Sequence, residues 1–274
     1  MGAAAGAGFA LAVRPISAAT ITTPADGLDA GDVTIKTSTG DIPGYRAVQA
    51  KRKKKAPVVL VVHEIFGVHE HIRDVCRRLA KQGYFAVAPD LFFRQGDVSQ
   101  LTDSRQIRSM VVSKVPDAQV MSDLDATMSF AKASGAGDVS RAALTGFCWG
   151  GRITWLYAAH ASAAALKAGV AWYGRLVGDK GAVTPRNPID VAGEIKAPVL
   201  GLYGGRDDGI PQDSVAQMRT ALAAGSAAAK RSEIKVYPDA GHAFFADYRP
   251  SYRADDAADG WSRMLAWFKA NGAG

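Results

Sequence analysis

The sequence predicts an α/β fold, in which a mostly parallel central sheet is flanked by helices on both faces. Two runs of consecutive apolar residues, 58–62 and 84–88, are typical of strands that are buried on both faces. Segments with helical spacing alternate with these and with later strands, and such alternation implies right-handed crossovers between parallel strands. The length of 274 residues suits one domain of this class.

The first half of the chain is expected to supply four strands and two helices. Between the third and fourth strands, Ile72, Val75 and Leu79 fall on one face of a predicted helix, and charged side chains lie elsewhere. Gly83 suits the left-handed conformation that commonly ends a helix. The strands are expected at residues 32–36, 42–48, 58–62 and 84–88, and the helices at 69–82 and 117–133.

The second half continues the alternation. Pro211 is well placed to open a helix, because its fixed backbone angle matches the first helical turn. Residues 174–196 are rich in glycine, proline and charge and are expected to form a loop insertion, so that residues 21–274 make a single domain. Strands are expected at 141–145, 168–173, 198–203 and 233–237, and helices at 150–165, 212–224 and 254–270.

Residues 1–20 are set apart from this domain by their composition. They are small and apolar, and Ser17, Ala18 and Ala19 resemble the cleavage site of an export signal whose basic start is missing. They are predicted to be a truncated export signal, which implies a periplasmic or exported protein, or a flexible tail on a cytoplasmic one. No other segment approaches the ~18 consecutive apolar residues of a membrane span.

The charge and the cysteine content exclude several classes of protein. The net charge of +7 is most concentrated in residues 51–55. Nucleic-acid binding would need a basic face that extends beyond one loop, so this run is expected to be a solvated loop. Cys76 and Cys148 are the only cysteines, too few for a disulfide framework and without the spacing of a zinc site.

A nucleophile elbow is predicted at residues 146–151, GFCWGG, between a strand and a helix. The pattern is G-x-S-x-G with Cys148 in the place of serine. Its glycines suit a strained turn that is crowded by neighbouring backbone. The turn would place the Cys148 sulfur at a helix N-terminus, where the dipole favours a thiolate. We therefore predict that Cys148 is a nucleophile rather than a buried structural cysteine.

Candidate acid and base residues follow two later strands. His242 is the only one of five histidines that comes after the last predicted strand. Asp207 and Asp208 follow the strand that ends at Tyr203; either could orient the histidine and stabilise its protonated form, while the other begins the next helix. The chain order of nucleophile, acid and histidine is that of the α/β-hydrolase fold.

The segment after the first buried strand, HEIFG, is predicted to complete an oxyanion hole. In this fold one backbone N–H comes from that loop and one from the residue after the nucleophile, here Ile65 and Trp149. Glu64 needs a partner at the end of a buried strand. It either pairs with His63 or a backbone amide, or lies near the thiol and controls its ionisation. The chain lacks an H-E-x-x-H motif, and no metal is expected.

Five segments together resemble the dienelactone hydrolases, also called carboxymethylenebutenolidases, over about residues 30–270. The resemblance implies Cys148 as nucleophile, His242 as base and Asp207 as acid. It also implies that Glu64 contacts the resting thiol until substrate enters, and that Arg94 binds a substrate carboxylate. The segments are HEIFGV at 63–68, APDLFFRQG at 88–96, GFCWGG at 146–151, YGGRDDGIP at 203–211 and DAGHAFF at 239–245.

Ala246 departs from the pattern of this family, whose enzymes acting on dienelactone carry a second arginine four residues after the histidine. Loss of one arm of a carboxylate clamp would weaken the binding of an anionic substrate by ~1.5–3 kcal/mol. Tyr248, Arg249 or Arg253 could take its place.

Aromatic side chains are expected to line a partly apolar site, with Phe93 and Phe244 as substrate-binding residues, although each could belong to the core instead. The full set is Phe92, Phe93, Trp149, Trp172, Phe244 and Phe245.

The predicted function is hydrolysis of a small lactone or ester through an acyl-thioester on Cys148. A general carboxylesterase or acyl-thioester hydrolase of the same fold is one alternative, and a non-catalytic protein that binds small ligands is another. The expected partner is a small-molecule substrate, without nucleic acid, membrane or cofactor, and the protein is expected to be a monomer or weak homo-oligomer.

Overall fold

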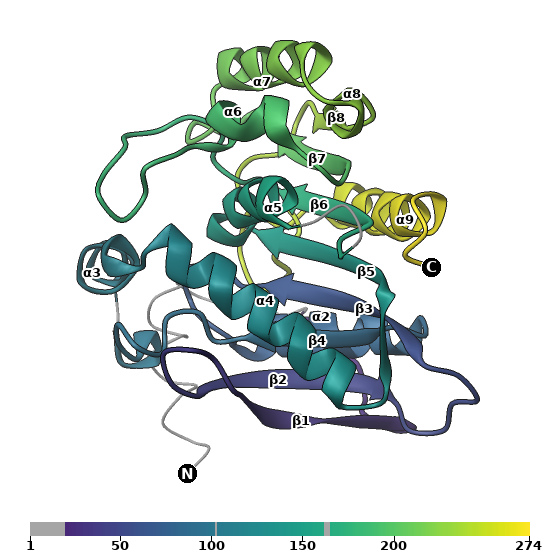
Figure 1. Ribbon diagram of the computed structural model, residues 1–274. Helices are drawn as coiled ribbons and strands as arrows, with labels where there is room; N and C mark the ends of the chain where they lie inside the picture. The colour runs from purple at the N-terminus through teal and green to yellow at the C-terminus, as the bar shows by residue number, and fades with distance from the viewer. Residues whose placement is uncertain (1–19, 102, 162–164) are drawn as a thin grey trace.

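The fold is built on one eight-stranded sheet with the order β1-β2-β4-β3-β5-β6-β7-β8 (Figure 1). The structure is a computed structural model that describes residues 20–101, 103–161 and 165–274. The strands are β1 (Leu28–Ile35), β2 (Ile42–Gln49), β3 (Ala56–Val62), β4 (Phe85–Pro89), β5 (Gly137–Phe147), β6 (Ala168–Trp172), β7 (Val199–Gly204) and β8 (Glu233–Tyr237).

The sheet is mostly parallel, as predicted. β1 pairs with β2, and β2 with β4, in antiparallel fashion, whereas every pair from β4 across to β8 is parallel. The apolar run of β3 is buried on both faces of the sheet from Val58 to Val62. Because the carboxyl ends of parallel strands lie at one edge, the segments that follow β3, β5, β6, β7 and β8 meet there.

Helices cover both faces of the sheet (Figure 1). α4 (Asp117–Ala133) and α5 (Trp149–His160) lie on the face toward the viewer, and α2 (Glu70–Lys81) and α9 (Ala254–Ala270) lie on the other. α7 (Gln212–Ala224) lies beyond β7 at the top of the view. This two-sided cover explains why the central strands are apolar throughout.

Several short elements were not predicted. The loop insertion at 174–196 contains α6 (Pro188–Val191) and a 3₁₀ turn, and the structure adds α3 (Ser104–Met110) and α8 (Ala227–Lys230). The helix expected to reach residue 165 ends at His160. No glycine or proline in that alanine-rich stretch marks the stop, so helical spacing alone placed the end too late.

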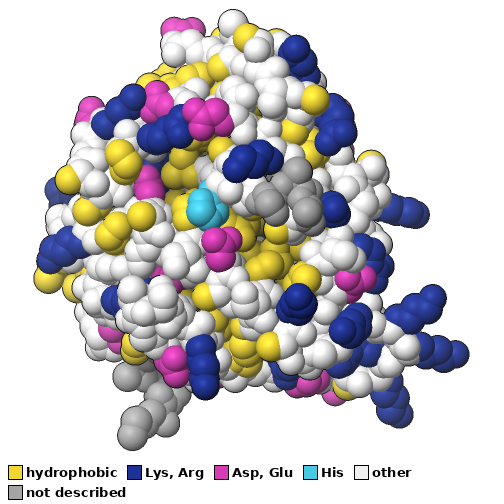
Figure 2. Space-filling view, viewed as in Figure 1, with side chains coloured by type: hydrophobic (Ala, Val, Ile, Leu, Met, Phe, Trp, Pro, Cys, Tyr) yellow, Lys and Arg dark blue, Asp and Glu magenta, His cyan; other side chains and the backbone are white. Residues whose placement is uncertain are grey.

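The predicted signal or tail at residues 1–19 lies outside the described residues, whereas the basic run at 51–55 forms the exposed loop between β2 and β3, where its side chains project from the surface (Figure 2). Within the described residues, no helix has both the length and the apolar character needed to cross a membrane.

Candidate active site

Cys148 lies in the sharp turn between β5 and α5, as predicted for an elbow. Its backbone adopts φ 54° and ψ −111°, a conformation that is strained for any residue with a side chain. The N–H of Cys148 donates to the carbonyl of Trp172 at the end of β6, at 3.0 Å, which holds the turn against the neighbouring strand. Trp149 is the first residue of α5, so the sulfur lies at a helix N-terminus.

Two glycines make this turn possible. A Cβ atom on Gly146 would come within 2.1 Å of the carbonyl oxygen of Gly150. A Cβ atom on Gly150 would come within 2.4 Å of the carbonyl oxygen of Val62, at the end of β3. Both contacts are with backbone atoms, which cannot turn aside as a flexible side chain can.

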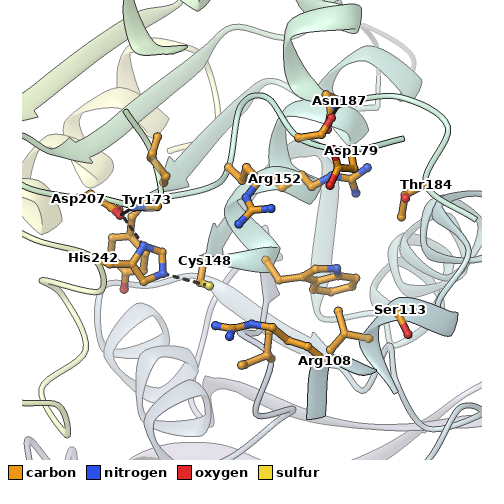
Figure 3. Close-up of a pocket in the computed structure, with 17 residues that line it drawn as sticks. Arg108, Ser113, Cys148, Arg152, Tyr173, Asp179, Thr184, Asn187, Asp207 and His242 are labelled. Atoms are coloured by element: carbon orange, nitrogen blue, oxygen red, sulfur yellow. Dashed lines mark hydrogen bonds and ion pairs between the residues drawn. The ribbon is translucent and has the colours of Figure 1, made fainter. Parts of the chain in front are cut away.

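His242 links Cys148 to Asp207 (Figure 3). Its Nε2 atom lies 3.2 Å from the Cys148 Sγ, and its Nδ1 atom lies 2.7 Å from Oδ2 of Asp207. Asp207 is buried, and its other oxygen accepts the N–H of Gly209 at 3.0 Å. Asp208, the alternative acid, is exposed to solvent. The structure thus brings together the three residues predicted to act together. The carboxylate in contact with His242 is that of Asp207 and not that of Asp208.

The surroundings of His242 favour its protonated form. Burial alone would lower the pKa of this histidine, but the charge of Cys148 and the hydrogen bonds to Asp207 and Cys148 outweigh it and raise the pKa to about 10. A protonated imidazole beside a sulfur atom stabilises a thiolate. The geometry therefore holds an imidazole that favours protonation 3.2 Å from the Cys148 sulfur.

The pair opens into a cavity of about 430 Å³. Ile65, from the segment after β3, and Trp149 both line it, as the predicted oxyanion hole requires. Polar and apolar side chains share the remainder of the wall. The other lining residues are Arg108, Val112, Ser113, Arg152, Tyr173, Arg175, Gly178, Asp179, Thr184, Asn187, Gly209 and Ile210.

Glu64 is buried beside this site, but its predicted contact with the resting thiol is not present. One carboxylate oxygen accepts a hydrogen bond from the Tyr248 hydroxyl and lies 3.6 Å from Nε2 of His69. Although burial opposes ionisation, a hydrogen bond from His69 and nearby positive charge lower the pKa of Glu64 to about 2. One carboxylate oxygen of Glu64 is thus held by Tyr248, on the loop after β8, and the sulfur of Cys148 contacts His242 instead.

His63, the alternative partner of Glu64, is occupied elsewhere. Its Nδ1 atom contacts the Glu64 carbonyl oxygen at 2.7 Å, and its Nε2 atom accepts the N–H of Leu91 at 3.1 Å. These contacts fix the neutral tautomer with the proton on Nδ1. His63 therefore anchors the backbone of the oxyanion segment rather than the Glu64 carboxylate.

Arg94 lies outside the cavity, which corrects its predicted role in binding a substrate carboxylate. Its guanidinium forms two bonds with the carboxylate of Asp123 on α4, at 2.8 and 3.0 Å, and a third with the Thr37 hydroxyl at 2.6 Å. The Asp123 side chain is buried, so Arg94 forms an internal link between α4, through Asp123, and the β1–β2 turn, through Thr37.

The two aromatic residues predicted to bind substrate are also placed elsewhere. Phe93 points to solvent, with 53% of its surface exposed, and Phe244 is fully buried against Trp172, Tyr173 and Tyr237. Neither lines the cavity.

None of the residues suggested as a substitute for an arginine at Ala246 lines the cavity. Tyr248 holds Glu64, Arg249 packs over Phe66 and Arg253 pairs with Asp256. The cavity has other arginines, which the sequence analysis missed.

Arg152 is held by Asp117 on α4, at 2.7 and 2.8 Å. Arg108 and Arg175 are exposed at the cavity and take part in none of the ion pairs found among the described residues. Arg175 follows β6 and could have been found by its place after a strand. Arg108 lies on α3, which has no clear sequence signal.

The family of the chain follows from sequence comparison. A sequence model described as the dienelactone hydrolase family matches residues 42–272. The chain belongs to the dienelactone hydrolase family. A protein of Methylorubrum extorquens, provisionally named a carboxymethylenebutenolidase, is 63% identical over 266 residues, which cover 97% of this chain and 89% of that protein. An Escherichia coli protein with the same provisional name is 55% identical over 265 residues, covering 97% and 96% of the two chains. The chain is thus a hydrolase of the carboxymethylenebutenolidase type.

Solved structures agree with this assignment. A crystal structure from Klebsiella pneumoniae, described provisionally as a dienelactone hydrolase, matches with a TM-score of 0.84 and 55% identity, covering 88% of this chain and 98% of that one. An esterase from Pyrococcus furiosus matches with a TM-score of 0.66 and 19% identity over 95% and 100% of the two chains, and supports the fold alone. The predicted α/β-hydrolase fold is confirmed.

Proposed function

We propose that this dienelactone hydrolase family member cleaves small esters or lactones through a Cys148–His242–Asp207 triad and an acyl-thioester. The supporting observation is the continuous contact from Asp207 through His242 to the Cys148 sulfur at the wall of the cavity, with distances of 2.7 and 3.2 Å. A base within hydrogen-bonding reach of the nucleophile, itself oriented by an acid, is what such chemistry needs.

Acylation begins when the Cys148 thiolate attacks the substrate carbonyl carbon. A C–S bond forms, and the carbonyl electron pair moves to the oxygen, which the N–H groups of Ile65 and Trp149 stabilise. The first residue of a helix has no acceptor for its N–H within the helix, so the Trp149 amide is available for this task. Collapse breaks the C–O bond to the leaving oxygen, and that oxygen takes the proton of the His242 imidazolium.

Deacylation returns the enzyme to its starting state. Neutral His242 removes a proton from water, the water oxygen attacks the thioester carbonyl, and the C–S bond breaks to release the acid and the thiolate. We assign the proton acceptor to His242 and not to Glu64, because His242 is the residue whose side chain contacts the Cys148 sulfur, at 3.2 Å.

We further propose that the preferred substrates are anionic. Arg108, on α3, and Arg175 bring to the cavity guanidinium groups that form no ion pair with the described residues, and Figure 3 shows Arg108 near Cys148. A guanidinium is well suited to a carboxylate. The alternative, a general carboxylesterase with no preference for charge, would make these arginines irrelevant to turnover.

The test is hydrolysis of cis- and trans-dienelactone and of neutral p-nitrophenyl acetate by the wild type and by Cys148→Ala. We expect Cys148→Ala to lower kcat/KM by about 10⁴-fold or more for every substrate that the wild type cleaves, since it removes the nucleophile. A variant that retains most of the rate would refute the thioester mechanism. Wild-type cleavage of the neutral ester alone would keep the mechanism and reject the anionic substrate.

A further inference from the structure

Tyr173 lines the cavity and carries a buried hydroxyl that has no hydrogen-bond partner among the described residues. The residue directly follows β6 and is fully buried, and no described residue is a hydrogen-bond partner for its hydroxyl. Burying a hydroxyl without a partner costs folding free energy, so such groups are rare in native proteins and call for an explanation.

The backbone of Tyr173 is unfavourable as well. Its φ of 38° lies in the left-handed region, which residues with a bulky side chain seldom adopt. The conformation is fixed from both sides: the Tyr173 N–H donates to the Leu202 carbonyl at 2.8 Å, and a Cβ on Gly174 would come within 2.2 Å of the backbone of Gly151. Backbone strain of this kind concentrates at functional sites.

The Tyr173 ring packs against the catalytic histidine. Its centroid lies 5.2 Å from that of His242, edge to face, and Figure 3 shows the two side chains next to each other. Burial, followed by the negative charges of Glu64 and Cys148, raises the pKa of the Tyr173 hydroxyl well above its usual value. The hydroxyl therefore keeps its proton and can act as a hydrogen-bond donor.

We propose that Tyr173 is a further catalytic residue, whose hydroxyl donates a hydrogen bond to an oxygen of the ester or lactone bound at Cys148. The inference rests on the proposed function and adds a side-chain donor to the amides of Ile65 and Trp149. Negative charge grows on the substrate oxygens as the Cys148 sulfur attacks, and a hydroxyl that donates to none of the described residues is free to stabilise that charge. Tyr173 gives up no proton in any step.

A structural role for this hydroxyl is the competing explanation. The Oε1 atom of Glu64 is also buried without a partner among the described residues, and a small shift could join it to the Tyr173 hydroxyl. Tyr173→Phe distinguishes the two roles, because it removes the hydroxyl and keeps the ring against His242. Loss of a structural hydrogen bond lowers stability, whereas loss of an unpaired hydroxyl does not.

The experiment measures p-nitrophenyl acetate hydrolysis, the melting temperature and the rate of alkylation of Cys148 by iodoacetamide. For Tyr173→Phe we expect kcat to fall by about 10- to 100-fold, with a smaller change in KM. We expect the melting temperature to be unchanged or higher, and alkylation to proceed at the wild-type rate because the Cys148–His242 pair remains. Tyr157→Phe is the control: its buried hydroxyl donates to Asp125 at 2.9 Å, outside the cavity. This variant should melt lower and keep its kcat.

Three results would overturn the inference. Tyr173→Phe could turn over at the wild-type rate, could melt lower with an unchanged kcat, or could fail to fold; the last two would make the hydroxyl structural. The proposed function fails separately, when the wild type shows no turnover that depends on Cys148, and the inference then falls with it. If the wild type is active through Cys148 and Tyr173→Phe has the same kcat, the proposed function stands and only the role of Tyr173 is rejected.

Discussion

His242 holds its proton more tightly than an ordinary histidine because it lies between Asp207 and the Cys148 sulfur. In the proposed mechanism this proton goes to the leaving oxygen, so acylation needs the protonated ring. With the pKa raised from 6.5 to about 10, the protonated form persists below pH 10 and is lost as the pH rises through that value.

We expect the loss of kcat/KM at alkaline pH to begin only as the pH approaches 10, where His242 gives up its proton. Asp207→Asn removes one of the groups that raise the pKa of His242, so the decline should move to lower pH. The measurement is the pH profile of kcat/KM for p-nitrophenyl acetate with both proteins. A wild-type decline centred near 6.5 would show that the histidine is not held in its protonated form.

Arg94 and Arg108 offer a matched test of which arginine recognises substrate. Arg94→Gln breaks a largely buried ion pair with Asp123 and should cost about 2–4 kcal/mol of unfolding free energy, with no change in KM. Arg108→Gln should leave stability unchanged and raise KM for an anionic ester about 10-fold, the effect of losing roughly 1.4 kcal/mol of binding. Urea unfolding and kinetics on anionic and neutral esters check both. If Arg94→Gln instead raised KM for the anionic ester without loss of stability, and Arg108→Gln did not raise it, the role predicted for Arg94 would be supported.

These residues show what sequence could and could not predict at this scale. Cys148, Asp207 and His242 each lie in the segment that follows a parallel strand, so their meeting at one sheet edge follows from the alternation of strands and helices. Arg94 also lies near a strand end, yet its side chain points away from the cavity because it pairs with Asp123, on a helix further along the chain. Pairings of that kind leave no local pattern.

Among the elements, the β5–α5 turn is the least tolerant of change. A Cβ on Gly150 would press on the Val62 and His63 carbonyl oxygens of the neighbouring strand, at 2.4 and 2.7 Å. We expect Gly150→Ala to cost about 3 kcal/mol or more, because the strand end must move away. Gly31→Ala in β1, where a Cβ would meet nothing within 4 Å, is the control and should change stability little. Equal unfolding free energies of the two variants would contradict the crowding argument.

The long elements were predictable because their apolar residues recur with a regular spacing and a residue typical of an element boundary lies near one end. α4, α7, α9 and β8 have the predicted bounds. β6, expected to reach residue 173, ends at Trp172 because Tyr173 turns into the left-handed region. The single-turn α6 and α8 are too short to show a period.

At the scale of the whole molecule, Asp247 joins the loop between β8 and α9 to α2, a helix from the first third of the chain. The side chain is fully buried and accepts from His71 at 3.0 Å and Arg78 at 2.6 Å, both on α2. We expect Asp247→Ala to cost about 3–5 kcal/mol, since it leaves Arg78 without one of its partners in a dry environment. Asp239→Ala removes an exposed pair with Arg206 and should have little effect. Urea denaturation of both variants measures the loss of unfolding free energy. A comparable loss in both would show that the ion pairs of Asp247 contribute no more than an exposed surface pair.

The loop between β8 and α9 carries His242, Asp247 and Tyr248, and through them it touches the sulfur, α2 and Glu64 in turn. All of these contacts reach back to residues that leave the ribosome much earlier. While the chain is being synthesised, Cys148 therefore remains an ordinary thiol without a base. Only a chain that includes this loop forms the Cys148–His242 contact, so a product truncated before residue 239 would keep the thiol but have no base to activate it.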